Sequence, residues 1–577
     1  MFFLPALLVP SLLLSLPLAA PAVPPSVAGG QLPEAGISAH ASATRPALHV
    51  SPSGYDSAAG TERRPLRTIA AAVAIAAAGQ EVVVHGGTYH ESIEIGEDKA
   101  DLTLRAAPGE QVWLDGAREV TGFGPSGDDW ARGGWTSQFD HSPTYSFGNP
   151  DNDRDNWRFL DPAFPMAAHP DGVWVDGEAQ KQVSSASAVR PGTFFVDDVA
   201  DLLVLGTDPH GRLVEASTLV RALSIRAKDV TVNGINVRRY APSVPHMGAV
   251  TAERDGIRLE RLSINDNATT GVHLMGDNIR VSRVTLAHNG MKGLGATGAD
   301  HLRIDRLRAI GNNTENFNTS PSSGGAKIGR STDIRVTRST FRANRGTGLW
   351  FDESTYRVSV ARSRMLNNLH HGLTFEISGR ISAVGNLIAN NTGDGINVND
   401  TDNVRIWNNT VVGNSRPINI VQDDRDVDPR GSYRDPDLPL TWRNSPVQIR
   451  NNVISGTGAS TSCLLCVEEY SRRWSASQLQ ITADGNLYYR KGNEDAPLLL
   501  WAGDRGRTMG FATIGGFRAA TGQESRGRVF TRAPLSGLKH RPTERVASVA
   551  HKVALRIPGP VAALLGLSRG SRALGAG

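Results

Sequence analysis

Residues 348–399 read GLWFDESTYRVSVARSRMLNNLHHGLTFEISGRISAVGNLIANNTGDGINVN. Within this stretch, three short segments begin at Gly348, Gly372 and Gly395 and read GLWFD, GLTFE and GINVN, so their starts are 24 and 23 residues apart. In each segment the second and fourth residues are apolar. Because successive side chains of a strand point to opposite faces, this alternation predicts short strands with one buried face.

The same pattern extends toward the N-terminus. Further segments start at Gly248 (GAVTA), Gly271 (GVHLM), Gly293 (GLGAT) and Gly325 (GAKIG), and the starts from Gly248 to Gly348 differ by 23, 22, 32 and 23 residues. A second strand is expected later in each repeat, as at residues 334–336, 358–360 and 404–406. An asparagine closes most repeats: Asn289, Asn312, Asn344, Asn368, Asn391 and Asn414.

Asparagine tolerates left-handed turns, and its amide can hydrogen-bond to the turn of the next repeat. A column of asparagines at one turn is therefore typical of a solenoid. A β-sandwich would not place strand and turn residues in register at this spacing. The sequence predicts an all-β chain, a single-stranded right-handed parallel β-helix of coils of about 23 residues.

The remaining chain is interpreted outward from these coils. Residues 68–78 are an alanine-rich amphipathic stretch, expected to form a helix that caps the open end of the stack. Residues 120–217 interrupt the repeat and are expected to form a small β-rich subdomain that walls a cleft. The predicted segments are a signal peptide (1–22), a disordered leader (23–46), the cap and first coils (47–119), the insertion (120–217), regular coils with the active site (218–455), irregular C-terminal coils (456–545) and a flexible or loosely helical tail (546–577).

Composition narrows the class of protein. The 577 residues include 61 Gly and 32 Pro, and the net charge of +4 is spread without a Lys/Arg run, which does not favour nucleic-acid binding. The apolar residues 2–18 followed by Ala20-Pro21-Ala22 indicate export. We therefore expect a secreted, extracellular monomer with no membrane association after cleavage.

Cys463 and Cys466 are compatible with a local disulfide, and two cysteines with no matching pair do not favour a zinc site.

The outward positions of the coils form two columns. The third places are His273, Gly295, Lys327, Trp350, Thr374 and Asn397, and the fifth places are Met275, Thr297, Gly329, Asp352, Glu376 and Asn399. Asp352 and Glu376 thus occupy equivalent places on consecutive coils, about 4.8 Å apart. Stacked like charges destabilise a sheet, so a functional role is favoured over a solvated acidic face. A separation of about 5 Å also matches the two carboxyl groups of retaining glycosidases.

Several polar residues surround this pair. Trp350 is a candidate sugar platform, and Lys327 could contact substrate or hold Asp352 ionised. His370, His371, Asn397 and Asn399 are candidate substrate-binding residues. The two histidines stand at a turn, where histidines are more often just polar surface, and the two asparagines are equally well interpreted as part of a polar outer face. The acidic run 423–428 could bind Ca²⁺, but it lacks a loop signature, and a solvated or arginine-paired loop is favoured. No metal is therefore assigned.

Two stretches resemble known families. Residues 50–89 resemble the opening of many bacterial pectate-lyase-like β-helix proteins. GLWFDESTYRVSV…NNLHHGLTFEIS resembles the active-site coils of β-helical glycoside hydrolases of the β-xylosidase type. By position, the resemblance implies that Asp352 is the nucleophile and Glu376 the acid/base, with no cofactor. Phe351-Asp352-Glu353 stands where that family has Leu-Asp-Trp, which leaves the sugar open.

Three functions follow as hypotheses. The first is a secreted glycoside hydrolase acting on a polysaccharide or oligosaccharide by a two-carboxylate retaining mechanism. The second is a uronate polysaccharide lyase or epimerase that uses Lys327 as the base. The third is a non-catalytic β-helical adhesin or glycan-binding protein, in which the acid pair is incidental.

Overall fold

A computed structural model of the protein describes residues 45–153, 157–457, 461–492, 495–537 and 540–576. The predicted signal peptide and nearly all of the predicted leader lie outside these described residues. Within the described ranges, no helix is both long and apolar enough to cross a membrane.

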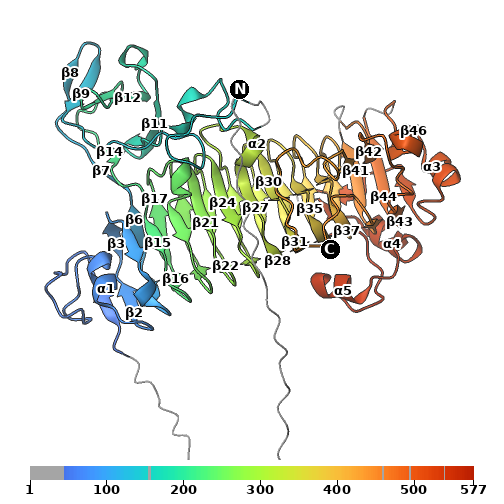
Figure 1. Cartoon of the computed structure of the whole chain (residues 1–577), viewed down its shortest axis with the longest axis horizontal. Helices are drawn as coiled ribbons and strands as arrows, with labels where there is room; N and C mark the ends of the chain where they lie inside the picture. The colour runs from blue at the N-terminus through green and yellow to red at the C-terminus, as the bar shows by residue number, and fades with distance from the viewer. Residues whose placement is uncertain (1–44, 154–156, 458–460, 493–494, 538–539, 577) are drawn as a thin grey trace, which may run out of the picture. The chain divides into compact units, whose positions relative to one another are not determined.

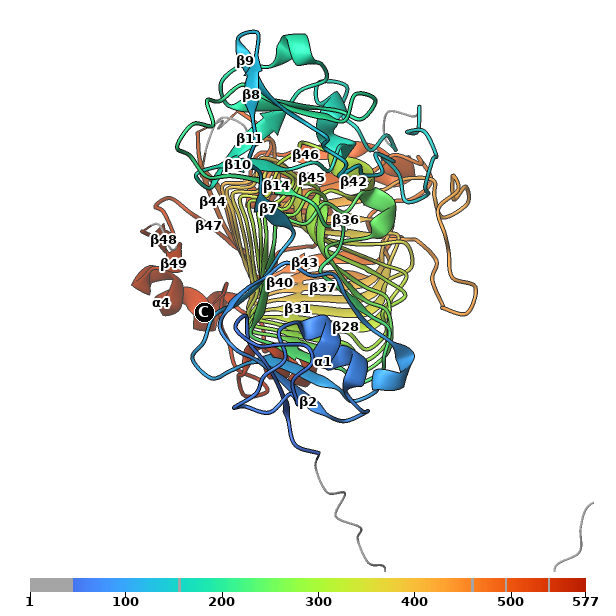
Figure 2. The same ribbon diagram turned by 90° about the vertical axis from the view of Figure 1, so that its left-hand side faces the viewer.

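The described chain winds into a stack of coils, seen from the side in Figure 1 and along its length in Figure 2. The coils build three sheets, each with 13 strands among the described residues. One coil supplies β30 (Thr347–Asp352), β31 (Tyr356–Ala361) and β32 (Arg364–Leu366), one strand to each sheet. The predicted parallel β-helix is confirmed. The third strand of each coil was not predicted, because it is only three residues long in most coils.

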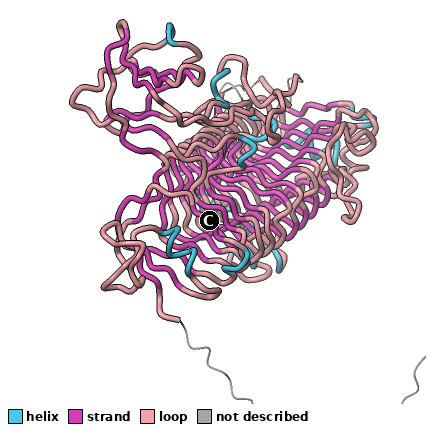
Figure 3. Tube along the Cα trace, turned by 60° about the vertical axis from the view of Figure 1, so that its left-hand side comes forward, coloured by secondary structure: helices cyan, strands magenta, loops and turns pink. Residues whose placement is uncertain are grey.

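One of the three sheets carries the candidate site. Its strands are, in spatial order, β4 (Ile93–Ile95), β15 (Leu223–Ile225), β18 (Val250–Ala252), β21 (Thr270–Leu274), β24 (Lys292–Thr297), β27 (Gly324–Gly329), β30, β33 (Leu373–Glu376), β36 (Ile396–Asn399), β39 (Ile418–Gln422), β42 (Leu465–Glu469), β45 (Leu499–Ala502) and β46 (Thr508–Phe511). These strands pair in parallel except for the final β45–β46 pair. The stacked strands, with loops at the turns, are shown in Figure 3.

The register places the predicted apolar columns inside the stack. Leu349 pairs with Leu373, and Phe351 pairs with Phe375. All four side chains are fully buried, and the two phenylalanine rings stack with centroids 5.4 Å apart. The interior is thus a set of continuous apolar columns, which fixes the opposite face of each strand as the outer one.

The predicted asparagine column is a buried hydrogen-bond ladder. Each amide nitrogen donates to the amide oxygen of the next coil, with Asn344 to Asn368 at 2.9 Å and Asn368 to Asn391 at 2.8 Å. The ladder also explains the glycine that begins each segment. A Cβ on Gly348 would lie 2.8 Å from the Asn368 amide nitrogen and 2.7 Å from the Gly372 carbonyl oxygen. A second ladder, not predicted, joins Asn386, Asn409, Asn452 and Asn486.

Asn368→Ala is expected to lower the free energy of unfolding by about 2–5 kcal/mol. The substitution leaves the backbone and side-chain N–H groups of Asn344 without their acceptor, at about 1–3 kcal/mol for each buried group. The shift of the denaturant midpoint measures this loss. Arg364→Ala, at an exposed position of β32, should change stability by less than about 0.5 kcal/mol. Equal shifts for both variants would contradict a stabilising role for the ladder.

The N-terminal cap is present. Helix α1 (Ile69–Ile75) starts after Thr68, whose side chain accepts a hydrogen bond from the Ala71 N–H. Ile69, Ala72 and Val73 are buried in the same core as the first coils. The helix therefore covers the open end of the stack, where apolar side chains and strand edges would otherwise meet water.

The insertion forms an eight-stranded sheet of its own, placed beside the first coils in Figure 1. Its strands are β7 (Ala117–Glu119), β8 (Gly124–Ser126), β9 (Asp129–Gly133), β10 (Val173–Val175), β11 (Glu178–Gln182), β12 (Thr193–Asp197), β13 (Leu202–Leu205) and β14 (Val214–Ser217). A separate apolar cluster that includes Val175, Phe194 and Leu205 forms its core. The loop between β9 and β10 returns to the coils, where Phe159 packs with Met291 and Phe317.

The C-terminal region differs from the prediction. Parallel pairing continues to β47 (Arg528–Phe530), which pairs with β44 (Leu487–Lys491), so these coils are more regular than expected. Of the two forms expected for the tail, flexible or loosely helical, the structure has the helical one. Residues 544–565 contain helices α4 (Glu544–Val553) and α5 (Gly559–Leu565). Their apolar faces are buried on the coils, with Val553 beside Leu487 and Val561 beside Trp407.

The two cysteines are paired. Cys463 and Cys466 form a disulfide, and both are fully buried. This is the local bridge that the sequence allowed.

Candidate active site

A cleft of about 1100 Å³ lies on the outer face of the site sheet. Its floor is formed by outward side chains of β21, β24, β27, β30, β33 and β36. Tyr145, Trp157 and Phe159 line it from the loop between β9 and β10, and Asp423, Arg425 and Arg430 line it from the loop after β39. All eight residues that the sequence singled out line this one cleft: Lys327, Trp350, Asp352, His370, His371, Glu376, Asn397 and Asn399.

The register places Asp352 and Glu376 at equivalent positions of consecutive coils. Phe351 pairs with Phe375, one residue before each acid, while Gly329 pairs with Asp352 and Glu376 pairs with Asn399. Adjacent strands lie about 4.8 Å apart, so the two carboxyl groups are neighbours. The inward packing of Phe351 and Phe375 forces both acids onto the cleft face.

Asp352 is held as part of an ion pair. The Lys327 Nζ lies 2.6 Å from Asp352 Oδ2, and the Glu353 N–H donates to Asp352 Oδ1 at 2.8 Å. Lys327 also donates to the Pro321 carbonyl oxygen at 2.6 Å and lies 3.9 Å from the centre of the Trp350 ring. Burial alone would lower the pKa of Lys327, but the charge and hydrogen bond of Asp352, together with Tyr145 and Glu376, outweigh burial and the pKa is raised. Lys327 is therefore a fixed cation.

Glu376 has different surroundings. The Trp350 indole N–H donates to its Oε2 at 3.1 Å, and the Arg425 guanidinium lies 2.6 Å from its Oε1. Burial, and then the charge of Asp352, raise the pKa of Glu376 despite the opposing effect of Arg425. Glu376 therefore holds a proton more readily than an ordinary glutamate. Two neighbouring carboxyl groups in unlike environments are suited to separate acid and nucleophile roles.

Arg425 was not predicted as a site residue. Its Nε also pairs with Asp400 at 2.9 Å and with Asp423 at 3.1 Å, which holds the guanidinium over Glu376. Two more carboxylates of the acidic run are paired with arginines, since Asp426 contacts Arg443 and Arg473, and Asp424 contacts Arg430. Asp428 instead accepts the Arg430 backbone N–H, so the loop is arginine-paired at Asp423, Asp424 and Asp426.

The two histidines lie side by side at the cleft, with ring centres 3.9 Å apart. His370 Nδ1 lies 3.0 Å from Thr347 Oγ1, and His371 Nδ1 accepts the Asp394 N–H at 2.9 Å. Burial, followed by the neighbouring His371, lowers the pKa of His370 to about 3, and burial lowers that of His371 to about 4. Both rings are neutral at physiological pH and can exchange hydrogen bonds with an uncharged ligand.

Several polar atoms on the cleft floor have no partner within the described residues. They are both ring nitrogens of His273, Thr374 Oγ1, Asn397 Oδ1 and Asn399 Oδ1. Buried polar atoms without partners cost about 1–3 kcal/mol each. A ligand rich in hydroxyl groups would satisfy them together.

A second polar cluster lies at the other end of the cleft. Lys292, only 2% exposed, donates to Tyr145 Oη at 2.9 Å and to Ser322 Oγ at 2.5 Å. Among the described residues, no carboxylate lies within ion-pair distance of its ammonium. Sequence reasoning missed this cluster, because Tyr145 reaches it from the insertion, 147 residues away in the chain.

Trp350→Phe tests the contribution of the hydrogen bond between the Trp350 indole N–H and Glu376. The substitution removes the indole N–H that contacts Glu376 but keeps an aromatic face beside Lys327. A hydrogen bond to a charged group contributes about 1.5–3 kcal/mol, so kcat should fall by about tenfold to hundredfold. Steady-state kinetics measures the change. Trp113→Phe, outside the cleft on β6 (Val112–Asp115), should leave kcat unchanged; parallel losses would contradict a specific role for Trp350.

Comparison with known proteins supports the architecture. The family described as "Right handed beta helix region" matches residues 222–355 and 315–433, which include every strand of the cleft floor. The chain is a right-handed parallel β-helix. A family of unknown function, DUF1565, matches residues 52–99 at the N-terminal cap of this β-helix.

Two curated relatives match a short stretch of the sequence, and a solved structure matches the fold. The uncharacterized protein YwoF of Bacillus subtilis is 42% identical over 72 residues, 12% of this chain and 15% of its own. Pectate lyase PEL9 of Emericella nidulans is 43% identical over 74 residues, 12% of this chain and 18% of its own. The chain thus spans less than a fifth of each curated relative. The solved complex of XylC with xylose has a TM-score of 0.57 at 15% identity, over 78% of this chain and 85% of that one, which shows a shared fold.

These matches show a shared β-helix fold with XylC and a short stretch of sequence similar to part of a pectate lyase. A fold shared at this identity does not define the reaction, since one fold hosts many chemistries. The reaction depends on the side chains of the cleft itself.

Proposed function

We propose that this protein is a glycoside hydrolase that cleaves a polysaccharide or oligosaccharide with retention of anomeric configuration. The observation that carries the proposal is the Asp352/Glu376 pair, on consecutive coils of one cleft and in unlike surroundings: each acid contacts a cation, but burial and the charge of Asp352 still raise the pKa of Glu376. Lys327 forms an ion pair with Asp352, and burial favours the acid form of Glu376. A retaining glycosidase needs one group in each form, about 5–5.5 Å apart.

In the proposed reaction, the Asp352 carboxylate attacks the anomeric carbon as the glycosidic bond breaks. Glu376 gives its proton to the departing oxygen, which leaves as an alcohol. Glu376, now a carboxylate stabilised by Arg425 and the Trp350 N–H, then takes a proton from water. The resulting hydroxide attacks the anomeric carbon and releases Asp352, so both carboxyl groups return to their starting states.

The polar groups of the cleft indicate the kind of substrate. The unpaired amide oxygens of Asn397 and Asn399 and the neutral His370 and His371 suit sugar hydroxyl groups rather than charged groups. Trp350 presents a ring face, although Lys327 already lies against part of it. With the apolar N-terminal segment interpreted as an export signal, the enzyme would act as a secreted monomer outside the cell.

A uronate lyase or epimerase is the second candidate, with a base other than Lys327. A general base must be unprotonated, and the raised pKa of Lys327 disfavours it in that role. The Tyr145–Lys292 pair suits the role better. Burial would raise the pKa of Tyr145, but the charge and hydrogen bond of Lys292, together with Ser322 and Lys327, outweigh burial and the pKa is lowered. Lys292, buried without a carboxylate partner among the described residues, could hold a uronate carboxylate while Tyr145 takes the adjacent proton.

A panel of neutral and uronate-containing polysaccharides separates these candidates. Xylan belongs in the panel because XylC shares the fold. New reducing ends without absorbance from unsaturated uronates would support hydrolysis. Absorbance that rises with the ends would establish a lyase, and altered uronate configuration without chain cleavage, seen by NMR, would establish an epimerase. Glycan retention with no product in any assay would instead support the non-catalytic binding protein.

A further inference from the structure

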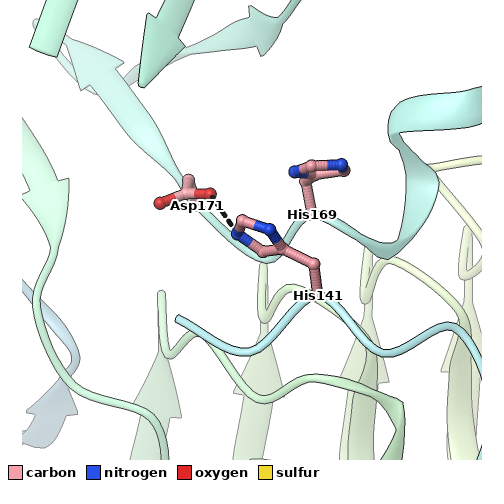
Figure 4. Close-up of side chains that lie close together, drawn as sticks. All are labelled: His141, His169 and Asp171. Atoms are coloured by element: carbon pink, nitrogen blue, oxygen red, sulfur yellow. Dashed lines mark ion pairs between the residues drawn. The ribbon is translucent and has the colours of Figure 1, made fainter. Parts of the chain in front are cut away.

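A separate cluster of candidate ligands lies in the loop between β9 and β10, outside the cleft. It consists of His141, His169 and Asp171, which face one another in Figure 4. One ligand atom from each lies within 4.8 Å of the other two. The three side chains line a cavity of about 250 Å³, together with Gln182 and Asp198.

Hydrogen bonding within the protein does not account for this arrangement. His141 Nε2 is buried and lacks a hydrogen-bond partner among the described residues, and its 3.8 Å separation from Asp171 Oδ2 is too long for a hydrogen bond. Gln182 Nε2 donates to Asp171 Oδ2 at 3.0 Å, while the other end of the same amide, Oε1, is buried without a partner. Two buried polar atoms of residues that line one cavity thus lack a hydrogen-bond partner among the described residues, at about 1–3 kcal/mol each.

We propose that His141, His169 and Asp171 bind a divalent transition-metal ion of the Zn²⁺ class. Two imidazole nitrogens and one carboxylate oxygen form a common donor set for such ions, with bonds of about 2.0–2.2 Å. Ligand atoms around a tetrahedral ion lie roughly 3.3–3.6 Å apart, so small side-chain rotations close the cluster. Gln182 already orients Asp171, as the partners behind metal ligands do, and its free Oε1 can accept from a water in the fourth position.

The position of the cluster gives the ion a structural role. His141 precedes Tyr145 by four residues, and His169 and Asp171 end the same loop directly before β10. Residues 134–172 contain no strand within their described part, so few backbone pairs hold this loop. An ion at the cluster would join the two ends of the loop. It would thereby hold in place the segment that contains Tyr145. This segment lines the cleft, and its Tyr145 hydroxyl contacts Lys292.

The test uses the mature protein, stripped with a chelator and titrated with Zn²⁺ alone by calorimetry. Wild type should bind one equivalent of Zn²⁺. His169→Ala and His141→Gln should each weaken that binding by about tenfold to hundredfold. His210→Ala, on the exposed surface of the same subdomain and outside the cluster, is the matched control and should bind as wild type does. A large excess of Ca²⁺ should not displace the Zn²⁺, because Ca²⁺ prefers oxygen ligands.

Thermal unfolding supplies a second readout that needs no substrate, so its outcome is independent of the proposed hydrolase activity. Saturating Zn²⁺ should raise the unfolding midpoint of wild type and His210→Ala but not of His169→Ala, because an ion bound only to the folded state stabilises it. Circular dichroism confirms that each variant is folded. The proposal is overturned if wild type binds no Zn²⁺, binds it no more tightly than His169→Ala does, or loses it to Ca²⁺.

Discussion

Asp352→Asn should lower kcat/KM by at least about 10³-fold, the scale of loss when a nucleophile is removed. The amide cannot form the glycosyl–enzyme ester, and it also removes the counter-charge of Lys327. The fold should remain, since Asp352 faces the cleft and an amide oxygen can still accept the Glu353 N–H. Turnover of the substrate found with the polysaccharide panel, together with circular dichroism, measures both effects.

The control for this variant is Asp333→Asn. Asp333 is also ion-paired, with Arg303 at 2.6 Å, but it lies on β28 (Thr332–Thr337), outside the cleft. Its substitution should leave turnover within about twofold of wild type. Full activity of Asp352→Asn would rule out Asp352 as the nucleophile, whatever the behaviour of the control.

Glu376→Gln should cost about 10²–10⁴-fold in kcat/KM on a natural glycoside, the usual contribution of a general acid. The loss should nearly vanish for an aryl glycoside whose phenolate leaves without protonation, because the first step then needs only Asp352. Comparison of kcat/KM for the two leaving groups measures the difference. An equal loss with both substrates would show that Glu376 acts in another way, such as in binding.

The protonation of Glu376 also determines the expected pH dependence of kcat/KM. A general acid works only while protonated, so kcat/KM falls as pH rises through the pKa of Glu376. Burial and the charge of Asp352 raise that pKa, so the fall should begin at higher pH than for an ordinary glutamate near 4.5. The natural glycoside should show this alkaline limb, whereas the aryl glycoside, whose first step needs no proton from Glu376, should not show it. A limb that persists unchanged would assign it to a different group.

The coil architecture could be predicted because its determinants are local and repeat. Gly348 and Gly372 leave room for the asparagine ladder, and Phe351 and Phe375 fix which face is buried. Once the inner face is known, the stacking of Asp352 above Glu376 follows from the spacing alone. This is why the period of the coils was enough to locate the site sheet and all eight proposed cleft residues.

Residues that enter the site from outside the coils could not be found in this way. Arg425 reaches Glu376 from a loop, and Tyr145 reaches Lys292 from the insertion, and neither follows the coil period. Their contacts depend on how non-repeating segments fold back, for which spacing gives no signal. The packing of the C-terminal helices was not predicted for a related reason, since Val553 and Val561 are buried only because distant coils offer an apolar surface.

The role of Lys327 depends on contacts that the sequence does not reveal. Its place beside Trp350 was predicted from the register, but two roles remained open, a cation for Asp352 or a base. The 2.6 Å contact with Asp352 and the raised pKa favour the first. A hydrolase and a lyase on the same wall thus differ in which residues hold protons, rather than in the fold.

The configuration of the first product tests the two-carboxylate account most directly. With a substrate identified by the panel, proton NMR at early times reports the anomer released before mutarotation. Attack by Asp352 followed by water predicts the same configuration as in the substrate, because two displacements restore it. Release of the opposite anomer would mean a single displacement by water and would contradict Asp352 as a nucleophile.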